Sequence, residues 1–137
     1  LMPPKGRVSL LEVSDLGRLL LALIPAESAR AAVYEADDGR NGGWTYESYA
    51  KAIGWGVGKP ITPISVPKPL LALVAHGDRF VRRSRAKLTP DRVSYLCHPD
   101  WVIDTTKRPP AEIWVPRVST RDGLKATAAA YRQAGWL

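Results

Sequence analysis

The sequence is poor in the residues that hold metals or form disulfides. Its 137 residues include one cysteine and two histidines. A single cysteine excludes an internal disulfide and any zinc site built from several cysteines. His76 and His98 are too far apart in the sequence to form a local metal pair, and Cys97 beside His98 has no further ligands nearby. We therefore predict no metal site and interpret Cys97 as a buried thiol.

Long apolar runs are also missing. The longest, Leu19–Ile24, is far shorter than the roughly 18 residues of a membrane span. The first residues lack the basic region and the cleavage site of a secretory leader. We therefore expect a cytoplasmic protein that does not enter a membrane. The opening Leu1-Met2-Pro3-Pro4 is unusual for a natural start, so we expect a sequence cut from a longer chain.

Positive charge is abundant. Twenty Lys and Arg against 13 Asp and Glu give a net charge of +7, which favours an anionic partner. One run places cations at Arg79, Arg82, Arg83, Arg85 and Lys87. It fits either a clamp on a phosphate or carboxylate or a solvated helix end, and we favour the second interpretation. Nucleic acid is a weaker candidate, because aromatic residues do not alternate with these cations and no nucleic-acid-binding signature occurs.

Two other patterns have ordinary explanations. Gly54 to Lys59 (GWGVGK) looks like a phosphate loop, but its glycine spacing is one residue short and Pro60 follows where Ser or Thr is needed. We predict that these glycines end a helix. The five tryptophans favour core positions or a docking surface over sugar stacking.

Helical periodicity and capping residues predict five helices. Apolar residues recur at helical spacing from Leu16 to Ile24, with Ser14 as the predicted cap and Pro25 as the end. Thr45, Thr89 and Ser119 are predicted to cap three more helices, the last of which stops at Gly135. The fifth is predicted over Lys68–Val81.

Four short apolar or β-rich stretches predict strands: Val8–Val13, Ala32–Ala36, Ile61–Val66 and Trp101–Asp104. Pro63 makes the third an edge strand or an irregular segment. Asp37–Gly43 has the composition of a turn. The predicted order β-α-β-α-β-α-α-β-α is a mixed α/β (α+β) pattern, and the length predicts one domain over residues 1–137.

Three stretches together resemble a known family. Val8–Leu16 (VSLLEVSDL) is similar to a family strand that enters a helix and usually ends in His-Val-Asp-Asp-Leu-Ala. Val33–Gly39 (VYEADDG), followed by Thr45 and Glu47, is similar to the strand, turn and helix that come next. Trp114–Leu137 resembles the closing pattern GW-x-P, L-x-x-G-L and WY-x-x-x-G. The chain thus resembles the C-terminal part of an extended short-chain dehydrogenase/reductase, of the NAD-dependent epimerase/dehydratase family.

The sequence departs from that family in places. Glu12 and Ser14 stand where His and Asp are common, and Ile113-Trp114 replaces Leu-Gly-Trp. The glycine-rich cofactor loop is missing. The catalytic Tyr-x-x-x-Lys is missing too, because none of the five tyrosines is followed by lysine four residues later. No catalytic or cofactor-binding residue can therefore be assigned, and whether this chain acts as an enzyme is left open.

The resemblance implies a substrate-binding lobe from a Rossmann-type protein, with a small sheet and about five helices. The NAD(P)-binding Rossmann part would precede it and is absent. NAD or NADP would serve the parent protein, with none bound to this chain alone. The substrate would be a small molecule, a nucleotide-sugar or another carbonyl or hydroxyl compound. We expect the lobe to be inactive alone, and to dimerise or dock on the missing part. Polar residues near loop ends are the candidates for lining its substrate cleft: Arg79, Arg82, Arg83, His98 and Trp101.

The alternative is a stand-alone basic module that binds nucleic acid or a protein partner. The charge of +7 motivates it. Salt-dependent retention on immobilised nucleic acid would distinguish it from the substrate-binding lobe.

Overall fold

A computed structural model describes residues 5–27, 31–83 and 89–137, with only the backbone for a few residues within these ranges, among them Arg79 and Arg82. Five α-helices and a small sheet make up a mixed α/β fold, which confirms the predicted class. The helices are α1 (Val13–Leu23), α2 (Tyr46–Val57), α3 (Lys68–Arg82), α4 (Pro90–Leu96) and α5 (Thr120–Gln133). Among the described residues, none of these helices has the length and apolar content needed to cross a membrane.

The sheet has three strands of two residues each: β1 (Arg7–Val8), β2 (Trp44–Thr45) and β3 (Asp100–Trp101). The order is β2-β1-β3, with β1 antiparallel to β2 and parallel to β3. Arg7 is in register with Thr45 and Asp100, and Val8 with Trp44 and Trp101. Because residues in register share one face of a sheet, Arg7 and Thr45 lie on one side and Val8 and Trp44 on the other.

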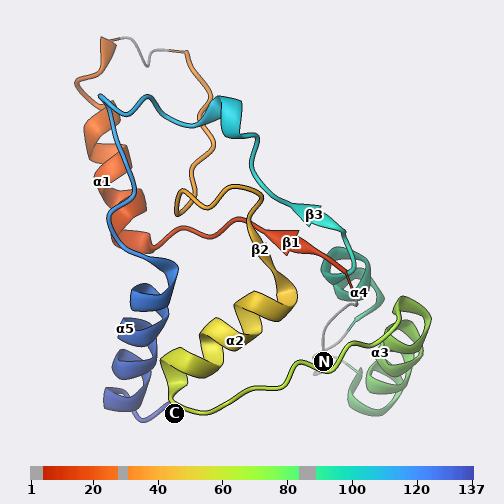
Figure 1. Cartoon of the computed structure of the whole chain (residues 1–137). Helices are drawn as coiled ribbons and strands as arrows, with labels where there is room; N and C mark the ends of the chain where they lie inside the picture. The colour runs from red at the N-terminus through yellow and green to blue at the C-terminus, as the bar shows by residue number, and fades with distance from the viewer. Residues whose placement is uncertain (1–4, 28–30, 84–88) are drawn as a thin grey trace.

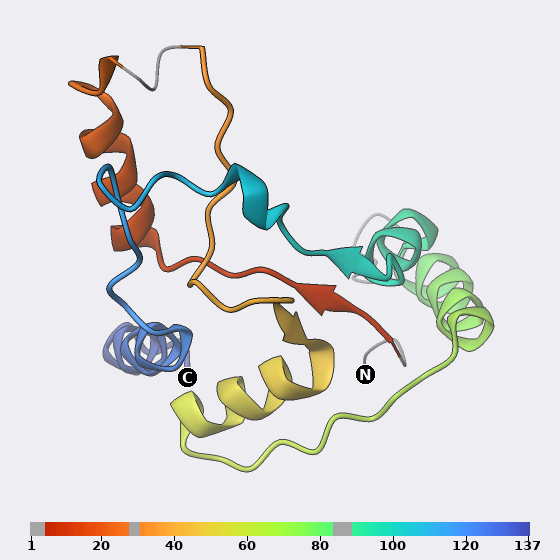
Figure 2. The same cartoon turned by 45° about the horizontal axis from the view of Figure 1, so that its top comes forward.

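The helices form two groups around this sheet (Figure 1). α1 and α5 lie at one side with α2 next to them, and α3 and α4 lie together at the opposite side. A long extended segment joins α2 to α3, as Figure 2 also shows. The α3–α4 pair has its own apolar cluster, formed by Val66, Leu71, Ala75 and Val93. On the other side, α2 packs closely against α5, since a Cβ on Gly56 would lie 3.0 Å from the backbone of Leu124.

Most predicted caps are correct. The side chain of Thr45 accepts from Ser48 N, that of Thr89 from Arg92 N, and that of Ser119 from Asp122 N. Gly58 ends α2 in the left-handed conformation, with φ +74°, as predicted, but Gly54 and Gly56 lie inside the helix rather than at its end. The predicted cap of α1 is wrong: Glu12 accepts from the N–H groups of Ser14 and Asp15, so the helix begins at Val13.

The predicted strands were too long or too many. Within Val8–Val13 only Val8 belongs to a strand, although Ser9 N still donates to Trp101 O at 2.9 Å. The end of the predicted stretch is not extended, since Glu12 caps a helix that begins at Val13. The segment 32–36 is not a strand; it is tied to residues 104–107 through Glu35, whose N–H donates to Lys107 O at 3.0 Å. The segment 61–66 is also irregular, with only a single bridge at Ser65, as expected where Pro63 has no N–H to donate. The fourth strand is Asp100–Trp101 rather than 101–104.

Candidate functional site

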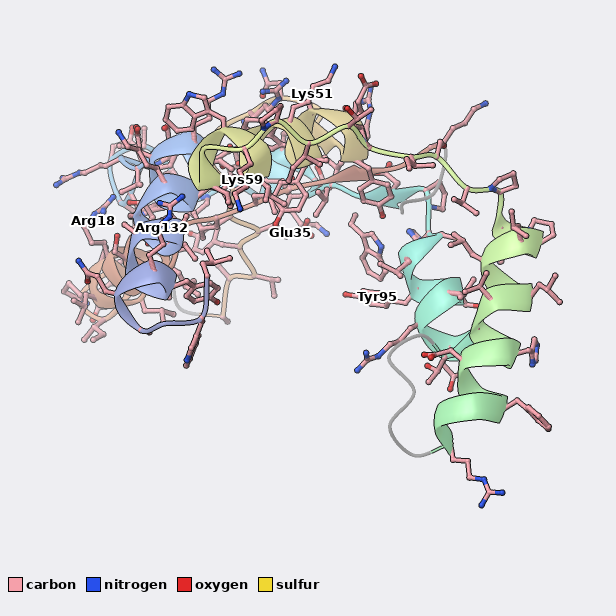
Figure 3. All side chains as sticks on the ribbon, turned by 90° about the horizontal axis from the view of Figure 1, so that it is seen from below. Arg18, Glu35, Lys51, Lys59, Tyr95 and Arg132 are labelled. Atoms are coloured by element: carbon pink, nitrogen blue, oxygen red, sulfur yellow. The ribbon has the colours of Figure 1, made fainter. Side chains whose placement is uncertain are left out.

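Two of the predicted site residues, His98 and Trp101, lie together in an aromatic cluster. Their ring centroids are 4.6 Å apart, and Trp101 lies 4.5 Å from the ring of Tyr95. Trp101 Nε1 donates to Tyr95 O, which ties β3 to the end of α4. All three side chains are exposed, and Tyr95 extends from α4 on the side away from α3 (Figure 3). The cluster is therefore accessible to a ligand.

His98 is oriented by the backbone that follows it. Its Nδ1 accepts a hydrogen bond from Asp100 N at 3.2 Å. The neutral ring then carries its proton on Nε2, which can act as a donor. This arrangement suits binding and orientation of a ligand.

The three predicted arginines are elsewhere. Arg83 follows the last residue of α3 and is exposed, whereas His98 follows the other end of α4. The backbones of Arg79 and Arg82 belong to the last turns of α3, but their side chains are outside the described part of the chain, as are Arg85 and Lys87 altogether. The structure thus brings His98 and Trp101 together and places Arg83 away from them.

Tyr46 connects the aromatic cluster to the first turn of α2. Its hydroxyl lies 3.2 Å from Leu96 O and 3.4 Å from His98 O, to which it can donate. Burial raises the pKa of Tyr46, and the charges of Cys97 and Tyr95 raise it further. The phenol therefore stays protonated, and remains a donor, across the neutral pH range.

On the other side of Tyr46 is a groove of about 600 Å³. Its floor includes Arg7 and Thr45 of the sheet, one wall is the start of α2, and the other wall is the extended segment 61–65. The ionisable side chains along it are Lys5, Arg7, Lys51 and Glu47. Lys51 is labelled on α2 in Figure 3. Three cations against one carboxylate make the groove basic.

Glu47 is already used within the groove. Its Oε1 accepts from Lys51 Nζ at 2.6 Å, and this hydrogen bond lowers the pKa of Glu47. Lys5 and Arg7 make no ion pair with the other described residues. The groove can therefore attract an anion with two uncommitted cations.

A buried carboxylate fixes the frame behind the site. Asp15 is 0% exposed, and its Oδ2 accepts from the N–H groups of Arg117 and Val118, each at 2.9 Å. Trp114 Nε1 donates to the main-chain oxygen of Asp15, and Arg18 forms an ion pair with its carboxylate. Burial alone raises the pKa of Asp15, but the hydrogen bonds from Val118, Arg117 and Arg18 outweigh it, so the pKa lies below its usual value.

A second buried carboxylate holds the turn at residues 37–43. Arg108 binds Asp37 with two hydrogen bonds of 3.0 Å, from Nε and Nη2. The side chain of Asp37 is 1% exposed, and it also accepts from Ser9 and Gly39. These contacts join β1, the turn and the segment after β3, so both buried carboxylates serve the architecture.

Several groove residues could not be identified from the sequence. Lys5, Arg7, Tyr46 and Lys51 are ordinary residues in their local context. They meet because β1 pairs with β2, and that long-range pairing has no local sequence signal. For metal binding, no group of three or more His, Cys, Asp and Glu among the described residues is suited to a metal ion.

No family model matches the sequence, and no curated protein matches it either.

Proposed function

We propose that this chain is the substrate-binding C-terminal portion of an NAD(P)-dependent epimerase/dehydratase or a related reductase. The cofactor and the catalytic Tyr-x-x-x-Lys pair would lie in a preceding Rossmann part. One observation carries the proposal: the three stretches that resemble this family make partly buried polar contacts with one another.

Asp15 belongs to the first stretch, and the N–H groups it binds belong to the third. The second and third stretches meet where Thr120 Oγ1 donates to Asp38, which also accepts from Trp44 Nε1 at 2.7 Å. Contacts among all three stretches are expected if they form one unit of the family. Buried polar contacts also demand a specific arrangement, because an unpaired carboxylate inside a protein is costly.

The exposed apolar face of α1 indicates that another protein surface covers this lobe. Val13, Leu16, Leu20 and Ile24 form one stripe of this helix, and they are between 42% and 79% exposed. Covering these partly exposed side chains would remove apolar surface from water and so favour association. The proposal therefore includes either docking of α1 on the preceding domain or pairing of two copies.

The decisive experiment compares two lengths of the protein. The 137-residue chain is expected to bind no NAD(P)H and to turn over no substrate. The coding sequence upstream of Leu1 is expected to contain the glycine-rich loop and Tyr-x-x-x-Lys, and the longer product to bind NADH or NADPH, followed by nicotinamide fluorescence. An upstream region without these motifs, or turnover by the short chain, would overturn the proposal.

A second proposal, a basic binding module, is favoured by the surface of α2 and α5. Trp55 is 52% exposed and Lys125 Nζ lies 5.8 Å from its ring centroid. Exposed aromatics beside cations can bind single-stranded nucleic acid by stacking and charge. Retention on immobilised single-stranded DNA at low salt, lost at high salt, is the expected behaviour of such a module. Absence of retention at low salt would eliminate it.

A further inference from the structure

The basic groove between β1, α2 and residues 61–65 has the composition of a binding site for an anion. Arg7 is the central cation. It is in register with Thr45, so both side chains lie on the sheet face that forms the groove floor. Lys5 lies two residues earlier and lines the same groove. Because Lys5 and Arg7 make no ion pair with another described residue, their charges remain available to a ligand.

The neutral residues of the groove add two kinds of contact. Thr62 and Ser65 have hydroxyl groups that can donate to an anionic oxygen. Tyr46, Ile61 and Pro63 have apolar surface that can pack against an organic body. A site with both kinds of lining suits a molecule with a charged head and an apolar or planar remainder.

We propose that this groove binds a small organic phosphate ester. Its phosphate would lie against Arg7 and Lys5, and its organic part against Tyr46 and the segment 61–65. A guanidinium binds two phosphate oxygens at once, and the ammonium of Lys5 adds a second charge. The volume of about 600 Å³ is within the range of small-molecule sites. That such an ester would also be the substrate of the parent enzyme rests on the proposed function; the binding itself does not.

The test is titration calorimetry on the 137-residue chain without cofactor. Phenyl phosphate supplies both parts of the expected ligand, inorganic phosphate supplies the head alone, and benzyl alcohol supplies a neutral aromatic body. Phenyl phosphate is expected to bind more tightly than inorganic phosphate, and benzyl alcohol to show no measurable binding. Raising the salt concentration should weaken the binding of phenyl phosphate.

Variants locate the site. Arg7→Gln should lower the affinity for phenyl phosphate by about tenfold, the loss expected for a charge-assisted bidentate contact. Arg7→Lys should lower this affinity less, because the positive charge remains. Arg121→Gln is the matched control, an exposed arginine of α5 outside the groove, and should change affinity by less than about twofold. Circular dichroism confirms that each variant is folded.

Three results would overturn the proposal: no binding of phenyl phosphate, equal binding of benzyl alcohol, or equal losses in Arg7→Gln and Arg121→Gln. If Arg7→Gln failed to fold, Lys5→Gln would take its place with the same expected direction. The outcome is separate from that of the cofactor experiment. A longer chain that never bound NAD(P)H would leave a measured phosphate site intact, and the reverse also holds.

Discussion

Asp15 accepts the backbone N–H of Val118 at 2.9 Å, across 103 residues of sequence. The same oxygen accepts from Arg117 N, so one buried carboxylate anchors the start of α1 to the chain before α5. Asp15→Asn removes the negative charge that pairs with Arg18, while the amide oxygen can still accept from both N–H groups. We expect a loss of about 2 to 4 kcal/mol of unfolding free energy, measured by urea denaturation. Glu112→Gln, at an exposed position, should change stability by less than about 0.5 kcal/mol. Equal effects in the two variants would contradict this role for Asp15.

The lowered pKa of Asp15 gives stability a definite pH dependence. Its folded-state pKa lies below the unfolded value near 3.9, so the contribution is complete above the unfolded pKa and is lost as pH falls through the folded pKa. The wild-type melting temperature should therefore fall steeply below about pH 4. Asp15→Asn should show a shallower decline over the same range. Parallel curves for the two proteins would rule Asp15 out as a source of the acid sensitivity.

Arg108 should be irreplaceable by lysine. Its guanidinium binds both oxygens of buried Asp37 and also donates from Nη1 to Asn41 at 2.9 Å. An ammonium cannot reproduce this geometry, so we expect Arg108→Lys to cost about 1 to 3 kcal/mol. Arg121→Lys on the surface of α5 should be nearly neutral. Thermal melts of both variants measure the loss of stability. If Arg108→Lys had no effect on the melting temperature, the positive charge alone would suffice.

Two helical glycines should respond oppositely to alanine. At Gly56, a Cβ would lie 3.0 Å from the backbone carbon of Leu124, forcing α2 and α5 apart. We expect Gly56→Ala to destabilise the protein by about 1 to 3 kcal/mol. At Gly17 in α1, nothing lies within 4 Å of the same position, so Gly17→Ala should stabilise it by about 0.5 to 1 kcal/mol. Chemical denaturation measures both, and a shared sign would mean that packing between α2 and α5 is looser than described.

The apolar stripe of α1 should drive association. Light scattering on the chain at micromolar concentration is expected to show species larger than the monomer, because Leu20 and Ile24 are 57% and 79% exposed. The double change Leu20→Lys with Ile24→Lys should restore the monomer. Val115→Lys, which also replaces an exposed apolar residue but lies outside α1, should not. A monomeric wild-type chain would argue against this surface as an interface.

Local signals predicted the helices well and the sheet poorly. Thr45, Thr89 and Ser119 act through neighbours three residues away, so their caps are visible in the sequence. The cap of α1 was missed because glutamate at position 12 is an unusual choice. The strands are only two residues long and pair across distant segments, which no local pattern encodes.

In the candidate site, too, contacts between sequence neighbours could be predicted and long-range contacts could not. His98 and Trp101 are three residues apart, so their proximity was within reach of sequence reasoning. Arg7 and Tyr46 line one groove only because β1 pairs with β2, immediately before α2. The pair of buried Asp37 and partly exposed Arg108 is separated by 71 residues, so it could not be predicted from the sequence either.

The extended segment that joins α2 to α3 has two tasks at once. Residues 61–65 form a wall of the basic groove, and α3 begins three residues later. The α3–α4 pair has its own apolar cluster at the far side of the molecule. The pair is joined to the groove twice, through the chain that leads from residues 61–65 into α3 and through Tyr46, whose hydroxyl lies 3.2 Å from Leu96 O at the end of α4. A substitution that loosens this distant helix pair is therefore expected to disturb the groove as well.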